Sequence, residues 1–104
     1  MGDGLCGVYS DPLHGHCLRI ITQTATHDYS IVGAYGIDEA PKPPNEPWVA
    51  TMHRDGKFLL VNFSEKMVNH ATIYSALWCP TSREIHWEDG NIWKKLFASS
   101  NQLM

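Results

Sequence analysis

Residues 85–95, "IHWEDGNIWKK", contain the clearest β-hairpin signal in the sequence. Two tryptophans flank an Asp-Gly pair, which is typical of the turn of a β-hairpin because glycine tolerates a positive φ angle. Successive side chains along a strand point to opposite faces of the sheet. The length of the turn therefore decides whether Trp87 and Trp93 share a face.

Two hairpin registers are compatible with this stretch. A two-residue loop at 89–90 would send Trp87 and Trp93 to opposite faces. A three-residue loop at 88–90 places the glycine in a left-handed position, and Ile85 and both tryptophans then share one face. We favour the second register, because it gathers the large apolar side chains on one side of the hairpin.

The same strand pattern continues through the rest of the chain. Short runs of β-branched and aromatic residues are separated by Gly, Pro, Asp and Asn, and helical periodicity is nearly absent. The pattern predicts an all-β fold, an antiparallel meander of about eight short strands that closes into a small β-barrel. The expected strands are 7–10, 18–23, 29–35, 48–53, 57–63, 72–78, 84–87 and 92–97.

Length and composition predict one globular domain over residues 1–104, with 43% hydrophobic and 18% charged residues. The proline-rich segment 38–47 is expected to be a surface loop and residues 99–104 a frayed tail. The net charge is −3 and no basic stripe exists, so nucleic acid is not an expected partner. No apolar run approaches the roughly 20 residues of a membrane span, so no membrane association is expected.

Cysteine usage and the start of the chain predict a cytoplasmic protein. Three cysteines are present, and residues 1–5 lack a signal-peptide pattern, so reduced thiols are expected. The sequence contains no P-loop, dinucleotide fingerprint, Gly-x-Ser-x-Gly or His-Glu-x-x-His motif. No cofactor is therefore expected, and an enzymatic activity is less expected than a binding function.

Four tryptophans in 104 residues suggest either a densely packed core or an aromatic pocket. The first hypothesis is a barrel that binds a small molecule or a short peptide. In the closing hairpin we expect Trp87 to be structural and Trp93, nearer the barrel rim, to contact the ligand. The expected ligand-binding residues are Tyr9, His14, Arg19, Trp48, Trp78 and Trp93.

Arg19 lies within an apolar run, so its side chain faces either solvent or a polar barrel interior. A buried arginine would require a carboxylate or a bound anion. The second hypothesis is a small enzyme that uses Asp11, His14 and Arg19 at one barrel mouth. The third is a homodimeric or larger interaction module with exposed aromatic residues at its interface.

The segment His14-Gly15-His16-Cys17 is the best local metal-binding pattern. On a strand, His14 and His16 would share a face, and Cys17 or Asp11 could add a ligand for Zn²⁺. A structural zinc site usually shows a second close pair of ligands, and the other histidines are scattered. The three residues are thus weak candidates, and zinc is not expected to be needed for folding.

Three segments of the chain carry distinctive patterns, G-x-Y-x-D-P-x-H at 7–14, V-x-F-S-x-K at 61–66 and I-x-W-x-D-G-N-x-W-x-K at 85–95. Together these patterns resemble a small β-rich domain of uncharacterised algal and protist proteins. The family carries no assigned activity, so the resemblance implies the fold alone. Residues 15–17 depart from the apolar or Pro-Gly segment of the family. The closing tryptophan hairpin also resembles lipocalin-like and avidin-like barrels in architecture.

Overall fold

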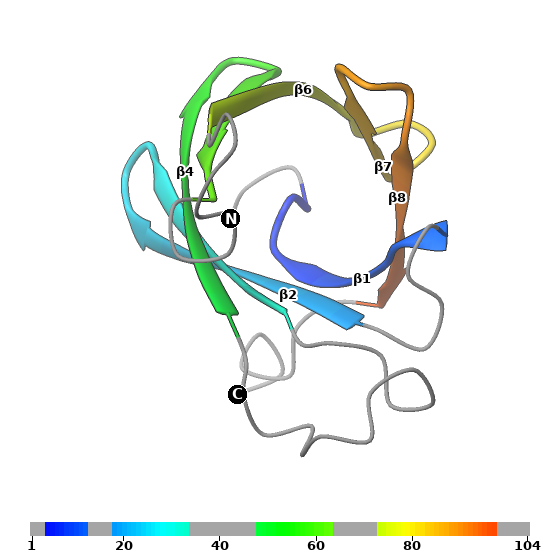
Figure 1. The fold of residues 1–104 in the computed structure, drawn as a ribbon, viewed down its shortest axis with the longest axis horizontal. Helices are drawn as coiled ribbons and strands as arrows, with labels where there is room; N and C mark the ends of the chain where they lie inside the picture. The colour runs from blue at the N-terminus through cyan, green and yellow to red at the C-terminus, as the bar shows by residue number, and fades with distance from the viewer. Residues whose placement is uncertain (1–3, 13–17, 34–47, 64–72, 98–104) are drawn as a thin grey trace.

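The computed structural model describes residues 4–12, 18–33, 48–63 and 73–97, and these form a closed antiparallel β-barrel (Figure 1). Each strand pairs with its neighbours in the chain, and the last strand closes against the first. The strands are β1 (Gly7–Ser10), β2 (Leu18–Ala25), β3 (Asp28–Gly33), β4 (Trp48–Asp55), β5 (Phe58–Asn62), β6 (Ile73–Cys79), β7 (Glu84–Trp87) and β8 (Ile92–Phe97).

The predicted all-β meander of eight strands is confirmed. The strand limits agree closely, although β2 continues to Ala25 and β4 to Asp55. The expected proline-rich loop 38–47 and the expected tail 99–104 lie outside the described residues. No helix in the described part of the chain is long and apolar enough to cross a membrane.

The two ends of the barrel differ in the connections that join their strands. Strand direction alternates around an antiparallel meander, so every second connection falls at the same end. We call one end the mouth end and the other the turn end. The mouth end has connections 11–17, 34–47, 63–72 and 88–91, and the turn end has connections 26–27, 56–57 and 80–83.

The beginning of the chain fills the turn end of the barrel. Figure 1 shows this segment, in dark blue, curled inside the ring of strands. Leu5 is 2% exposed and belongs to the core, and the Tyr9 hydroxyl donates a hydrogen bond of 2.6 Å to its carbonyl. The Tyr9 ring packs edge-on against Trp78, and Lys95 Nζ donates to the Gly4 carbonyl. These contacts close this end without a long loop.

Alternation along the strands builds the core. In β4, Trp48, Ala50 and Met52 point inward and are buried, and the residues between them are exposed. Arg54 continues the inward series at the turn end, where it is half-buried. Its guanidinium donates to the Tyr29 hydroxyl and its Nε to the Gly56 carbonyl. An inward position thus places this arginine at the edge of the core, where water remains within reach.

Candidate functional site

The β7–β8 hairpin has the three-residue loop that the sequence favours. The Trp87 amide donates to the Asn91 carbonyl and the Gly90 amide donates to the Trp87 carbonyl, both at 2.9 Å. Gly90 has a φ of +94°, and Ile85 lies opposite Trp93. Trp87 and Trp93 therefore share the inward face and are 7% and 4% exposed, so the predicted register is confirmed.

The expectation that Trp93 lies nearer the barrel rim is wrong. Trp93 pairs with Ile85, whereas Trp87 is the last residue of β7 and lies one inward position closer to the mouth end. The reason is the loop of three residues, which shifts β8 relative to β7 and draws Trp93 deeper. Of the two indoles, that of Trp87 is the one next to the mouth.

Arg19 is buried at the mouth end and paired with a carboxylate. Its side chain is 2% exposed, and its Nη2 donates to Asp11 Oδ2 at 3.3 Å. Asn91 Nδ2 donates to the other oxygen, Asp11 Oδ1, at 2.9 Å. A buried charge without a counter-charge is strongly destabilising, so Asp11 makes this burial tolerable. Of the two predicted solutions for a buried arginine, the structure uses the carboxylate.

Two tryptophans hold the Arg19 guanidinium. Its central carbon lies 4.9 Å from the ring centroid of Trp48 and 5.5 Å from that of Trp93. Both distances are within the roughly 6 Å over which an indole ring attracts a cation. A guanidinium is planar and weakly hydrated, which allows it to lie against aromatic rings where an ammonium would need more water.

Four aromatic residues at the mouth end form one continuous set, which we call the mouth cluster. The cluster consists of Trp48, Phe63, Trp87 and Trp93. Neighbouring ring centroids in that order lie 5.7, 5.6 and 4.7 Å apart. Gly33 lies beneath the first ring, since a Cβ there would be 2.3 Å from Trp48 Cζ2. Only glycine leaves room for this indole against β3.

The mouth cluster contains a buried donor that the described residues leave unsatisfied. Trp87 Nε1 is fully buried and has no hydrogen-bond partner in the described part of the chain. Buried N–H groups are almost always paired, because an unmade hydrogen bond costs about 1–3 kcal/mol. Because this indole lies at the mouth end, its N–H, unpaired among the described residues, is the donor of the cluster to which a bound ligand could offer an acceptor.

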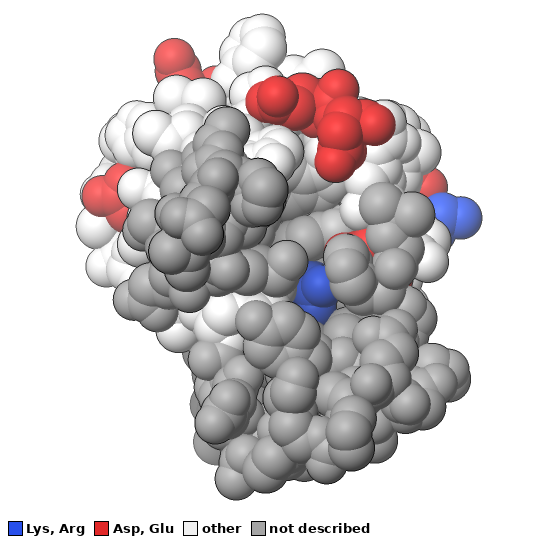
Figure 2. Space-filling view, viewed as in Figure 1, with Lys and Arg blue, Asp and Glu red and all other residues white. Residues whose placement is uncertain are grey.

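Glu88 fastens the mouth end of the hairpin to β6. Its amide donates to the Ser75 carbonyl at 3.0 Å, and its Oε1 accepts from the Ser75 amide at 2.6 Å and hydroxyl at 3.0 Å. These donors, the backbone amide first, hold the pKa of Glu88 below its usual value. Figure 2 shows acidic side chains gathered over this hairpin. The hydrogen bonds between Glu88 and Ser75 thus extend the pairing of β6 with β7 beyond the last residue of β7.

The predicted ligand-binding residues fall into two groups. At the mouth end the Arg19 guanidinium contacts both Trp48 and Trp93. Tyr9 pairs with Arg19 across β1 and β2, yet its ring packs on Trp78 toward the turn end, and both are at most 1% exposed. Tyr9 and Trp78 thus serve as core residues in the described part of the chain, and the mouth group is the candidate site.

The remaining predicted site residues, His14, His16 and Cys17, lie outside the described residues. Within the described ranges, no group of three or more His, Cys, Asp or Glu side chains could hold a metal ion. The enzyme hypothesis joined His14 to Asp11 and Arg19. The last two do converge, but both Asp11 oxygens already accept hydrogen bonds, so this carboxylate is poorly placed to act as a base.

Phe63 and Asn91 complete the site and were not anticipated from the sequence. Phe63 follows β5 and joins Trp48 to Trp87. Asn91 follows the hairpin glycine and reaches Asp11 at the other end of the chain. No local pattern signals a contact between residues so far apart. The closure of β8 on β1 brings them together.

No protein-family model, no curated protein and no solved structure matches the chain. Of the likenesses expected from the sequence, the structure supports the small β-barrel architecture alone. Membership of that family stays a prediction, as does a cytoplasmic location. The geometry of the site is therefore the basis for assigning a function.

Proposed function

We propose that the protein is a small-molecule-binding β-barrel whose ligand contacts the mouth cluster. The observation that carries the proposal is the buried Trp87 Nε1, an N–H donor without a partner among the described residues. A ligand that accepts this hydrogen bond removes an energetic penalty already present in the protein. Rigid aromatic walls with one directed donor are typical of small-molecule sites.

The chemistry of the cluster favours a neutral, flat ligand with a hydrogen-bond acceptor. The Arg19 charge is balanced by Asp11, so the site does not require an anionic ligand. Aromatic rings stack in offset or edge-on geometry on indole and phenyl walls such as those of Phe63 and Trp93. A carbonyl, ether or ring-nitrogen acceptor on that ligand would receive the Trp87 proton. An aromatic side chain of a short peptide offers similar surface, and a short peptide is the alternative ligand.

Quinoline and naphthalene test this proposal as a matched pair. They have the same fused-ring shape, but only quinoline carries an acceptor nitrogen. The chain contains four tryptophans, so its indole N–H signals in an NMR spectrum can be assigned with single Trp→Phe variants. We expect quinoline to move the Trp87 indole signal downfield and to bind about tenfold more tightly than naphthalene.

Trp87→Phe is the matched control variant, because it keeps a ring at this position and removes only the indole donor. Quinoline and naphthalene should bind that variant with equal affinity. Equal binding of both probes to the unaltered protein would show that Trp87 does not select the ligand. If neither probe moves the signals of Trp48, Trp87 or Trp93, the mouth cluster is core alone and the proposed function is wrong.

A further inference from the structure

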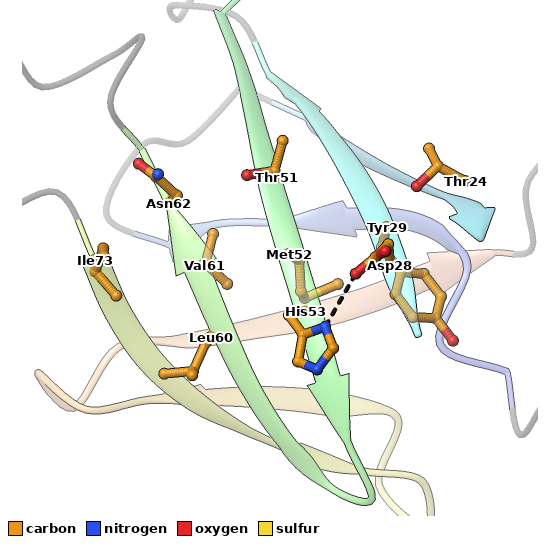
Figure 3. A pocket seen from close by; sticks show the side chains of 10 residues that line it. All are labelled: Thr24, Asp28, Tyr29, Thr51, Met52, His53, Leu60, Val61, Asn62 and Ile73. Carbon is orange, nitrogen blue, oxygen red and sulfur yellow. Dashed lines mark hydrogen bonds and ion pairs between the residues drawn. The ribbon is translucent and has the colours of Figure 1, made fainter. Parts of the chain in front are cut away.

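A groove separate from the mouth cluster crosses the outer face of the barrel over strands β2 to β6 (Figure 3). It encloses about 410 Å³. That volume lies within the range of roughly 300–1,000 Å³ that is usual for small-molecule sites. The sequence carries no signal for this groove, because outward positions of strands are ordinarily solvated.

Strand register explains which side chains line the outer groove. Residues paired across antiparallel strands point to the same face and form rows. The two rows that line the groove are Asp28, His53 and Leu60, and Thr51, Asn62 and Ile73. Met52 and Val61 alternate with these residues along β4 and β5, point into the core and form part of the floor.

The polarity of the groove changes from one end to the other. Figure 3 shows Leu60 and Ile73 at one side and Asp28 and Thr24 at the other. Leu60 and Ile73 are 53% and 60% exposed, so this side of the groove presents apolar surface to solvent. His53 Nδ1 donates to Asp28 Oδ1 at 3.0 Å and so fixes the carboxylate.

The charge of the groove is negative. No Lys or Arg is among its described lining residues, and Asp28 Oδ2 accepts no hydrogen bond from the described part of the chain. An anion is therefore disfavoured, while a cation would complete the carboxylate's coordination.

We propose that the outer groove binds a small organic amine with an apolar body. The ammonium group pairs with Asp28, and the apolar body covers Leu60 and Ile73. Strands lie about 4.8 Å apart, so Asp28 and Leu60, two strands from each other, are separated by roughly 10 Å. A ligand of this class needs a cation and an apolar end at about that spacing. This site is independent of the proposed function at the mouth.

The probe is 4-phenylbutylamine, whose extended chain can span the groove from the carboxylate to the leucine. Its matched controls are 4-phenylbutanol, which lacks the charge, and 4-phenylbutyrate, which reverses it. Titration of the full chain, followed by backbone amide NMR, should show shifts at Asp28, Thr51 and Leu60. We expect the amine to bind about fivefold more tightly than the alcohol, and the butyrate to bind most weakly.

Two substitutions locate the site, each with an exposed control elsewhere. Asp28→Asn should weaken amine binding about fivefold, whereas Asp55→Asn, outside the groove, should change it less than twofold. Leu60→Ser should weaken it about threefold, and Leu96→Ser on β8 should have no such effect. All four side chains are exposed, so folding is preserved.

Three results would overturn the proposal. The first is equal affinity for the amine and the alcohol. The second is an equal loss of amine affinity in Asp28→Asn and Asp55→Asn, which would mean general attraction to an acidic surface. The third is an absence of amide shifts in the groove on addition of the amine. None of these results bears on quinoline binding at the mouth cluster.

Discussion

The turn end and the mouth end of the barrel bury an inward arginine in different ways. At the turn end, Arg54 is half-buried and donates to a hydroxyl and a backbone carbonyl next to solvent. At the mouth end, Arg19 is 2% exposed and lies against Asp11 and two indoles. The depth at which each guanidinium is buried therefore determines which partners it needs. A shallow guanidinium keeps its water, and a deep one needs a counter-charge and aromatic walls.

Removing the counter-charge should have the largest effect on stability. Asp11→Ala leaves Arg19 buried without its carboxylate, and we expect a loss of about 3–5 kcal/mol in the free energy of unfolding. Arg54→Met at the turn end should cost only about 1 kcal/mol, because it removes hydrogen bonds near solvent. Urea unfolding of both variants makes the comparison.

The double variant Asp11→Leu with Arg19→Met separates the cost of a broken pair from the value of the pair itself. Replacing both charges with apolar groups should recover most of the stability that Asp11→Ala loses. A loss below about 1 kcal/mol for Asp11→Ala would contradict the deep burial of Arg19 and erase the difference between the two ends.

Gly33→Ala tests the packing of the mouth cluster. A Cβ at this position would lie 2.3 Å from Trp48 Cζ2, so the indole must move. We expect a loss of about 1–3 kcal/mol and a changed near-ultraviolet circular dichroism spectrum. Combining Gly33→Ala with Trp48→Phe should restore part of the loss, since the smaller ring leaves space. An unchanged spectrum for Gly33→Ala would mean that Trp48 does not lie over β3.

Hairpin glycines should respond equally at the two ends. Gly90 at the mouth end and Gly56 at the turn end have φ angles of +94° and +64°, and a Cβ on either would meet no atom within 4 Å. Only backbone strain then penalises alanine, so each substitution should cost about 1 kcal/mol in thermal or urea unfolding. A much larger loss at Gly90 would reveal contacts made by the mouth loop that Gly56 does not share.

Acid titration should give the smallest effect. The pKa of Glu88 is lowered by the Ser75 amide, and that of Glu84, at the turn end of β7, by its hydrogen bond to His86. Because both folded values lie below the ordinary 4.5, ionised carboxylates stabilise the fold above that pH. This contribution is lost as the pH falls below 4.5 through the folded pKa values.

Glu88→Gln and Glu84→Gln should each flatten part of the decline in unfolding free energy between pH 5 and pH 3. The glutamine keeps an acceptor oxygen for Ser75 or His86 but cannot ionise. Both variants are measured against the unaltered chain by urea unfolding at each pH. If the acid dependence of Glu88→Gln matches that of the unaltered chain, the Glu88–Ser75 contact does not hold the hairpin in solution.

Local sequence features were enough to predict the strands and the register of the closing hairpin. Alternating side chains and Asp-Gly turns are local features, so residues 85–95 were enough to place Trp87 and Trp93 on one face. The same local signals predicted eight strands and a closed barrel. They also identified Arg19 as a residue that must face either solvent or a counter-charge.

Which of those residues come into contact depends on the pairing of strands that are distant in the sequence. Asp11, Arg19 and Asn91 come together because β8 pairs with β1, and no local pattern reports a contact across 80 positions. The outer groove likewise arises from side chains that lie next to one another on five different strands. The residue pattern along one strand determines which face of the sheet a side chain occupies. Only the pairing of strands determines which side chains lie next to it.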